Sequence, residues 1–353
     1  MDCYDLSLHK ALKQQGCETL IYSNFQSDEP GIFKAFKFRI SENYFSFFRM
    51  LSEYWRISGD ISKRQVQHCI VHGFRFGLAE WLLVRVLKKS SVKIFMIVHD
   101  PDSLLGTTKS KKCRKRIFDL CDTLVVHNNF SAGELLKEFK NSEIKISVIP
   151  HGHFIDTAVA STDSELFKSK NLLDKGNKYL LFFGHIKKSK GLDLLLEALV
   201  QTNPGICLVI AGRMRKHSFD EYLELISRYK LQSRIKIFPG YISPELRNEL
   251  FQMADAVVLP YRKVFQSGVM LMAMSYGRAV IASDLVPVRE MITDRVNCFL
   301  FNTGDKDSLS STIELAMTDE DMRREIAKQG KVYVEANHDW SLIAAKWLKL
   351  FQR

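Results

Sequence analysis

The sequence predicts an α/β protein built from two Rossmann-like domains in tandem, and three observations support this fold class. Short apolar segments of strand length alternate with amphipathic helical segments in both halves of the chain, which is typical of parallel sheets with helices on both faces. The length of 353 residues favours two domains over one. A polar stretch without a clear period, Phe154–Lys178, interrupts the alternation and is interpreted as an inter-domain linker.

The first half of the chain opens with a helical pattern, Tyr4–Gln14, where a Rossmann-like domain ordinarily opens with a central strand and a Gly-rich turn. We therefore expect the first domain to lack its opening strand. The strands that follow are expected at Thr19–Tyr22, Cys69–Val71, Lys93–Val98, Thr123–Val126 and Lys145–Ile149. Helices between them are expected at Leu78–Leu87 and Ser131–Phe139.

The second half repeats the alternation more clearly. Strands are expected at Leu180–Phe183, Cys207–Ala211, Ile235–Phe238, Ala256–Leu259, Ala279–Ala282 and Cys298–Phe301. Helices are expected at Gly191–Val200, Phe219–Tyr229, Pro244–Met253, Gly268–Tyr276 and Asp305–Met317, with tail helices at Asp319–Glu335 and Trp340–Gln352. Ser243 and Pro244 form a typical helix start, an N-cap followed by proline.

Composition excludes several classes of protein. The apolar runs, such as Ile94–Val98, are far shorter than the roughly 20 residues of a membrane-spanning helix. The seven cysteines are scattered without the two-residue spacing of zinc or redox sites, which favours a reducing compartment. The first sixteen residues contain no apolar signal core. A cytoplasmic location is therefore expected.

The net charge of +11 favours an anionic partner. The densest basic segment is expected to contact the inner face of an anionic membrane; it comprises Lys109, Lys111, Lys112, Arg114, Lys115 and Arg116. A solvated helix face explains the same segment equally well. A nucleic-acid-binding protein would also explain the charge, but not the regular strand–helix units described above.

Two segments carry the features of phosphate-binding loops. In the first, an apolar strand ends at Gly184, and a basic loop containing Lys187 and Lys190 leads into a helix. In the second, Gln266-Ser267-Gly268 joins a strand to a helix N-terminus. Loop amides and helix N-termini favour anions, although ordinary surface lysines and a plain helix cap are the alternatives. Ligands of such sheets bind at strand carboxyl ends.

A third candidate is His99, which follows the strand Lys93–Val98 directly. A histidine at this edge of the sheet faces the usual ligand crevice and could bind a sugar hydroxyl or a reacting centre. A structural histidine in a turn is the alternative. His127 and His151 also follow strands and are weaker candidates.

Taken together, these segments resemble the family 4 retaining glycosyltransferases of the GT-B fold, in which two Rossmann-like domains face each other across a cleft. The resemblance is strongest between Gly184 and Glu290. The segments that carry it include FFGHIKKSKGLDLLLEAL, LVIAGR, FPGYISPELRNELFQMADAVVLPYR and SGVMLMAMSYGRAVIASDLVPVREMI. It implies an N-terminal acceptor-side domain, 1–155, with helix 339–353 packed back on it, and a C-terminal nucleotide-sugar domain, 178–338.

The resemblance also implies roles for individual residues. Lys190 matches the donor-phosphate lysine of the family and His99 its active-site histidine, so both are expected to be catalytic. The two glutamates usual in the helix motif are replaced by Val264 and Met272. Donor-binding residues are expected to be Gly184, Lys187, Lys190, Gly240, Tyr241, Ile242, Gln266, Ser267 and Gly268.

The implied activity is transfer of a sugar, with retained anomeric configuration, from a nucleotide-diphosphate sugar to a glycan or lipid-linked acceptor in surface polysaccharide synthesis. No metal and no cofactor are expected besides this co-substrate. A catalytically impaired nucleotide-sugar binding protein is the first alternative, because the opening strand is expected to be missing. A basic nucleic-acid-binding protein is the weaker one.

Overall fold

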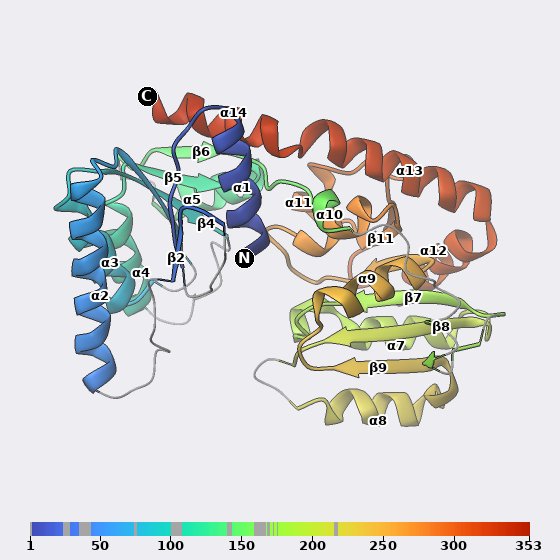
Figure 1. The fold of residues 1–353 in the computed structure, drawn as a ribbon. Helices are drawn as coiled ribbons and strands as arrows, with labels where there is room; N and C mark the ends of the chain where they lie inside the picture. The colour runs from blue at the N-terminus through green and yellow to red at the C-terminus, as the bar shows by residue number, and fades with distance from the viewer. Residues whose placement is uncertain are drawn as a thin grey trace. The chain divides into compact units, whose positions relative to one another are not determined.

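The fold is that of a computed structural model, which describes residues 2–23, 29–34, 44–73, 76–99, 108–139, 143–158, 167, 170–171, 173–174, 176–214 and 218–353; for 2–3, 44–47 and 108–111 it describes the backbone alone. The chain divides into two compact units (Figure 1). Unit 1 comprises Met1–Gly152 and Trp340–Arg353, and unit 2 comprises His153–Asp339. Each unit is an α/β structure with a parallel sheet, as the alternation of apolar runs predicts.

Unit 1 is built on a four-stranded parallel sheet of β3 (His68–Gly73), β4 (Lys93–Val98), β5 (Thr123–Val126) and β6 (Ile146–Val148), which pair in chain order. Helices cover both faces, as a parallel sheet requires. On one face, α1 (Asp2–Gln14) and α14 (Trp340–Phe351) share a buried cluster with β4 and β5. On the other face lie α2 (Tyr44–Lys63), α3 (Leu78–Lys88), α4 (Thr108–Phe118) and α5 (Asn129–Glu138).

The front of unit 1 departs from the expected elements. The strand expected at Thr19–Tyr22 is β1 (Ile21–Ser23), and it pairs in parallel with β2 (Ile32–Lys34), which the sequence did not predict. These two strands form a sheet of their own. Among the described residues, helix α1 precedes every strand, and no strand pairs with the outer edge of β3.

Unit 2 contains a six-stranded parallel sheet. Its strands are β7 (Lys178–Phe183), β8 (Ile206–Gly212), β9 (Ile235–Pro239), β10 (Ala256–Leu259), β11 (Ala279–Ser283) and β12 (Phe299–Phe301). They lie in the order β12-β11-β10-β7-β8-β9. The chain builds outward from β7 in one direction and then crosses to β10 and builds outward in the other. This is the doubly wound Rossmann order, whose ligand crevice opens where the direction reverses, between β7 and β10.

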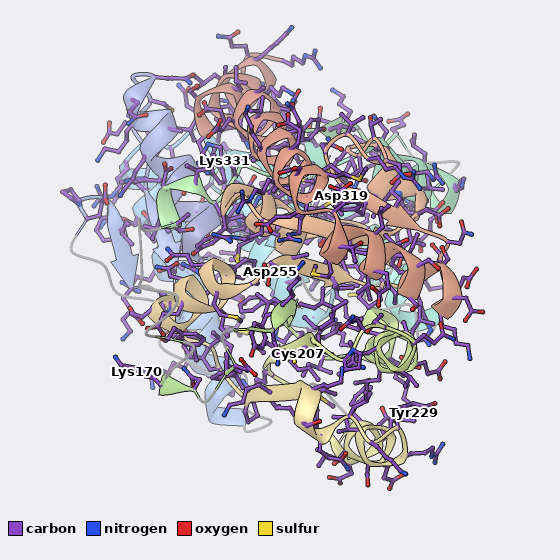
Figure 2. The ribbon with its side chains drawn as sticks, turned by 90° about the vertical axis from the view of Figure 1, so that its right-hand side faces the viewer. Lys170, Cys207, Tyr229, Asp255, Asp319 and Lys331 are labelled. Atoms are coloured by element: carbon purple, nitrogen blue, oxygen red, sulfur yellow. The ribbon has the colours of Figure 1, made fainter. Side chains whose placement is uncertain are left out.

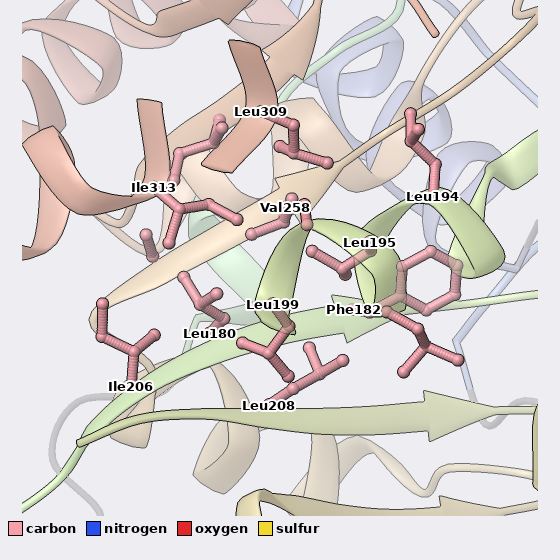
Figure 3. Close-up of a cluster of buried hydrophobic side chains, with 14 of the residues drawn as sticks. Leu180, Phe182, Leu194, Leu195, Leu199, Ile206, Leu208, Val258, Leu309 and Ile313 are labelled. Carbon is pink, nitrogen blue, oxygen red and sulfur yellow. The ribbon is translucent and has the colours of Figure 1, made fainter. Parts of the chain in front are cut away.

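Helices cover both faces of the sheet of unit 2. On one face, α7 (Leu192–Val200), α8 (Asp220–Arg228) and α12 (Lys306–Thr318) bury the side chains shown in Figure 3, among them Leu180, Leu195 and Ile313. On the other face lie α9 (Pro244–Met253), α10 (Gly268–Ser275) and α13 (Glu320–Asn337). Asp255, labelled in Figure 2, ties the start of β10 to β7 by accepting a 2.7 Å hydrogen bond from the Tyr179 amide. Short elements complete the chain: η1 (Ile155–Thr157), η2 (Lys188–Lys190), η3 (Gln232–Arg234) and α11 (Val286–Arg289).

Candidate functional site

The residues predicted to bind the donor lie in three loops of unit 2, which follow β7, β9 and β10. Gly184 follows β7, Gly240 follows β9, and Gln266-Ser267-Gly268 leads from β10 into α10. Because all six strands are parallel, these loops meet at the carboxyl edge of one sheet. The loops after β7 and β10 flank the reversal of strand order, which is the usual ligand position in this topology.

Glycines allow the backbones of these loops to approach each other closely. Gly191 has a φ of +68°, and a Cβ added there would lie 1.9 Å from the carbonyl oxygen of Pro260. Gly212, at the end of β8, has a φ of +148°, and a Cβ there would lie 1.8 Å from the Gly184 oxygen. A side chain at either position would push strand ends apart. The two glycines therefore hold the loop after β7 against its neighbours.

Arg262, in the loop after β10, links that loop to the loop after β7 by hydrogen bonds. The Arg262 amide donates to the Ser189 carbonyl at 2.9 Å, and its guanidinium donates to both carboxylate oxygens of Asp193 at 2.7 Å. Burial disfavours ionisation of Asp193, but the bonds from Arg262 outweigh it and hold the pKa of the carboxyl below its usual value. Sequence reasoning gave neither residue a role, because they lie 69 positions apart.

Lys190 lies at the centre of this arrangement. Its Nζ is 3.4 Å from the centroid of the Tyr261 ring, in cation–π geometry. Tyr261 is buried, and burial raises the pKa of its phenol above the usual value, so the ring stays neutral beneath the ammonium group. Lys187 is half-buried on the same loop. Two cations thus emerge from one loop at the carboxyl edge of the sheet.

The segment 266–268 contains one hydroxyl that caps helix α10 and one buried side-chain amide donor. The Ser267 hydroxyl accepts a 3.2 Å hydrogen bond from the Met270 amide and caps α10, so the helix-cap interpretation holds for this side chain. The Nε2 amide of Gln266 is buried and has no acceptor among the residues that the structure describes. A buried donor without an acceptor is costly, and it lies one residue from the cap of α10. This amide and the helix N-terminus provide donors for an anionic or carbonyl oxygen.

The loop after β9 contributes mainly backbone. The Gly240 amide donates to the Gly212 carbonyl at 3.0 Å, with a φ of +102° at Gly240. Tyr241 is exposed, and Ile242 packs partly buried against the apolar cluster beneath α9 and α10.

In unit 1, His99 follows β4 at the carboxyl edge of its sheet and belongs to a chain of three polar side chains. The His72 Nε2 lies 2.7 Å from Asp5 Oδ1, and the His72 Nδ1 lies 2.7 Å from the His99 Nε2. A carboxylate only accepts, so a neutral His72 carries its proton on Nε2 and accepts at Nδ1. His99 then donates from Nε2 and keeps its Nδ1 lone pair as an acceptor.

All four strands of the unit 1 sheet end near a histidine: His72, His99, His127 and His151. The Tyr4 ring lies edge-on to several of them, with centroid distances from 4.8 to 6.3 Å. Burial, with the neighbouring histidines adding to it, lowers the pKa of His99 far below its usual value. Among the described residues, no three His, Cys, Asp or Glu side chains are placed to share a metal ion.

Asp5 and His72 were missed by sequence reasoning. The signal for His72 was present, because an apolar run followed by histidine occurs at all four strand ends. Asp5 gave no signal, since its partner lies 67 residues away.

The basic segment 109–116, which was expected to contact a membrane, is only partly exposed to solvent. Arg114 is buried, ion-paired with Glu138, and its guanidinium lies 5.6 Å from the centroid of the Phe139 ring. The expectation that Arg114 contacts a membrane is therefore wrong, because the side chain supports the packing of α4 on α5. Lys112, Lys115 and Arg116 are exposed; the side chains of Lys109 and Lys111 lie outside the described residues. Within the described part of the chain, no helix has the length and hydropathy needed to cross a membrane.

Comparison with solved structures shows the fold. Sucrose-phosphate synthase from Thermosynechococcus elongatus superposes with a TM-score of 0.79 at 18% identity, covering 99% of this chain and 92% of that one. The Anabaena protein HepE, in complex with UDP and glucose, superposes with a TM-score of 0.73 at 16% identity, covering 88% and 84%. These likenesses show that the chain has the GT-B fold.

Comparison of sequences shows the family. The family described as Glycosyltransferase Family 4 matches residues 6–157, and Glycosyl transferases group 1 matches residues 163–333. A curated relative from Campylobacter jejuni, N,N'-diacetylbacillosaminyl-diphospho-undecaprenol alpha-1,3-N-acetylgalactosaminyltransferase, is 29% identical over 219 residues, which cover 62% of this chain and 56% of the relative. The chain spans about 56% to 61% of the length of the first curated relatives. The two family matches together cover most of the sequence, and the chain belongs to the family 4, group 1 glycosyltransferases.

Proposed function

We propose that this protein transfers a sugar, with retained anomeric configuration, from a nucleotide-diphosphate sugar to a hydroxyl of a glycan or lipid-linked acceptor. Unit 2 binds the donor and unit 1 the acceptor. The observation that carries the proposal is the convergence of Lys187, Lys190, the buried Gln266 amide and the α10 N-terminus at the strand-order reversal of unit 2. HepE, a structural neighbour, was solved with UDP, which supports a uridine nucleotide.

The chemical need that these groups meet is stabilisation of a leaving group. Cleavage of the bond to the anomeric carbon leaves negative charge on the diphosphate, and donors aimed at that charge lower the barrier. In this proposal Lys190 leaves the Tyr261 ring to pair with a phosphate oxygen, while Lys187 and the Gly268 amide bind the remaining oxygens. Gly184, the Ser267 cap and the Gly240–Ile242 loop shape the walls of the nucleotide site. These groups supply the counter-charge without a metal ion.

His99 is proposed to accept a hydrogen bond from an acceptor hydroxyl at Nδ1, since the hydrogen-bond chain Asp5–His72–His99 places the His99 proton on Nε2. The Campylobacter relative acts, by its name, on a diphospho-undecaprenol acceptor. A lipid-linked acceptor in surface polysaccharide synthesis, reached from the cytoplasmic face of a membrane, is the corresponding proposal here.

The test is calorimetric titration with UDP and UDP-sugars in EDTA, followed by a transfer assay with lipid-linked acceptors. We expect UDP binding in the wild type and loss of transfer by two to three orders of magnitude in Lys190→Ala. Lys188→Ala is the matched control, because Lys188 is exposed and pairs with Glu221 at 3.4 Å. No binding of any nucleotide, or unchanged transfer in Lys190→Ala, would refute the proposal.

Two alternatives predict different outcomes, the first in these experiments and the second in a titration with generic DNA at increasing salt. Nucleotide binding without turnover on any acceptor would indicate an impaired binding protein, the alternative raised by the expectation that the first domain lacks its opening strand. Tight binding of generic DNA that weakens steeply with salt would favour a nucleic-acid-binding protein.

A further inference from the structure

Helix α2 of unit 1 presents an unusual exposed face. Its exposed residues with described side-chain positions recur at helical spacing along one side: Phe48, Arg49, Ser52, Trp55, Arg56, Ser62 and Lys63, with Gly59 between them. Phe48 is 68% exposed and Trp55 is 53% exposed. The two aromatic residues lie seven positions apart and therefore on the same face. Exposed large apolar side chains that gather on one face indicate an interaction surface.

The charge on this face has one sign. Arg49, Arg56 and Lys63 are exposed, and no acidic side chain in the described part of α2 is. Glu53 is buried near Arg49, and the half-buried Asp60 carboxylate pairs with Arg64 at 3.0 Å. The face thus combines aromatic rings with positive charge.

Helix α3 extends the same surface. The Ser58 and Ser90 hydroxyl oxygens lie 2.6 Å apart, and the Lys89 Nζ lies 4.8 Å from the centroid of the Trp55 ring. On α3, Leu78 is 59% exposed, and the Arg85 guanidinium lies 5.0 Å from the Trp81 ring. The exposed side chains of α3 are Leu78, Arg85 and Lys88, again without an acidic residue. Figure 1 shows α2 and α3 side by side within unit 1.

We propose that the α2–α3 face docks unit 1 on an anionic lipid surface, with Phe48, Trp55 and Leu78 entering the interfacial layer. Aromatic rings with basic neighbours are the side chains that favour the headgroup region. Lysine and arginine near an anionic bilayer add attraction that decays within a Debye length. The lysines and arginines of this face match an anionic headgroup layer in sign, and the exposed apolar side chains match the acyl boundary beneath it.

The proposal relocates membrane contact from α4 to α2 and α3. Helix α4 buries Arg114, and its exposed Lys115 is held by Asp119 at 2.9 Å. None of the large apolar side chains exposed in the described part of unit 1 lies on α4. The docking surface is independent of the transfer chemistry, so failure of either proposal leaves the other standing.

The experiment measures binding of the full chain to vesicles of phosphatidylglycerol and phosphatidylcholine by co-sedimentation, with pure phosphatidylcholine as the reference. We expect binding to the anionic vesicles that weakens with added salt. The double variant Phe48→Ser/Trp55→Ser should bind more than about tenfold more weakly. Arg56→Gln and Lys63→Gln should each cost about fivefold. Leu136→Ser, at an exposed apolar residue of α5, and Arg116→Gln on α4 are matched controls that should bind normally.

A spectroscopic variant separates docking from nonspecific adhesion. Brominated lipid should quench tryptophan fluorescence in the wild type, and Trp55→Phe should keep vesicle binding while losing most of that quenching. Thermal melts of every variant establish that the fold is kept. No binding to anionic vesicles, equal binding by the Phe48→Ser/Trp55→Ser variant, or loss of binding in Arg116→Gln would each overturn the proposal. Retention on nucleic acid in place of vesicles would overturn it as well.

Discussion

Replacing His99 with glutamine should remove a defined part of the pH dependence of unit 1 stability. His99 is held neutral in the folded protein, mainly because it is buried and also because His72, His127 and His151 surround it. In the unfolded chain it takes up a proton below its ordinary pKa of 6.5. The unfolded state therefore binds more protons at low pH, and stability falls as the pH falls below 6.5. Above that pH the stability is fully present.

The size of this loss of stability follows from the uptake of one proton by His99 in the unfolded chain. For a histidine that stays neutral when folded, lowering the pH from about 7.5 to about 5.5 costs about 1.4 kcal/mol. His9 and His68 also have pKa values lowered by burial. They are present in both proteins, so their contributions cancel when the His99→Gln variant is compared with the wild type.

The assay is urea denaturation followed by tryptophan fluorescence at the two pH values. All four tryptophans belong to unit 1, namely Trp55, Trp81, Trp340 and Trp347, so the signal reports on that unit. When the pH is lowered from about 7.5 to about 5.5, the free energy of unfolding of the wild type should fall by about 1.4 kcal/mol more than that of His99→Gln. A difference below about 0.5 kcal/mol would show that His99 is protonated in the folded state and would refute the reasoning.

Three further predictions concern the loops and the histidine chain. Gly191→Ala should destabilise unit 2 by more than about 2 kcal/mol in urea denaturation followed by circular dichroism, since a Cβ there meets backbone; normal stability would contradict this. Lys187→Ala should reduce transfer less than Lys190→Ala does, because Lys190 is the residue that matches the donor-phosphate lysine of the family and its Nζ is positioned over the Tyr261 ring; equal rate losses would contradict this ranking. Asp5→Asn should convert His99 from one tautomer to a mixture of two, because an amide side chain can either accept a hydrogen bond from His72 or donate one to it. The tautomers would be measured by ¹⁵N NMR of labelled histidine. A proton on Nδ1 of His99 in the wild type would contradict the proposed hydrogen-bond chain Asp5–His72–His99.

The strands of unit 2 were predicted within two residues because buried parallel strands are continuous apolar runs bounded by polar turns. Helix α2 was not predicted for the opposite reason. Its exposed Phe48 and Trp55 place apolar residues on both sides of the helix and hide its 3.6-residue period. Helix α4 was expected only as one of two interpretations of its basic segment, because it contributes few apolar residues, Cys113, Ile117 and Phe118 among its described side chains, and the sequence shows mainly its charge.

The candidate site was predictable where it depends on strand ends and not where it depends on partners distant in sequence. Gly184, Lys190 and Gln266 follow from the rule that ligands bind at the carboxyl edge of a parallel sheet. The burial of Arg114 could not be predicted from any such rule, because Glu138, the carboxylate that neutralises it, lies 24 residues further along the chain. The same holds for Asp5 and His72, whose contact appears only once α1 is packed on the sheet.

The position of α14 has a consequence for how the protein is made. Trp347 is fully buried against Phe95 of β4, and the Trp340 ring occupies the space that a side chain at Gly152 would need. A ribosome therefore completes all of unit 2 before it releases the fourteen residues, Trp340–Arg353, that finish the apolar cluster of unit 1. During synthesis, before α14 emerges, only α1 is available to cover Phe95, Ile97 and Val125 on that face of the unit 1 sheet. The second unit to emerge is the first that can fold to completion.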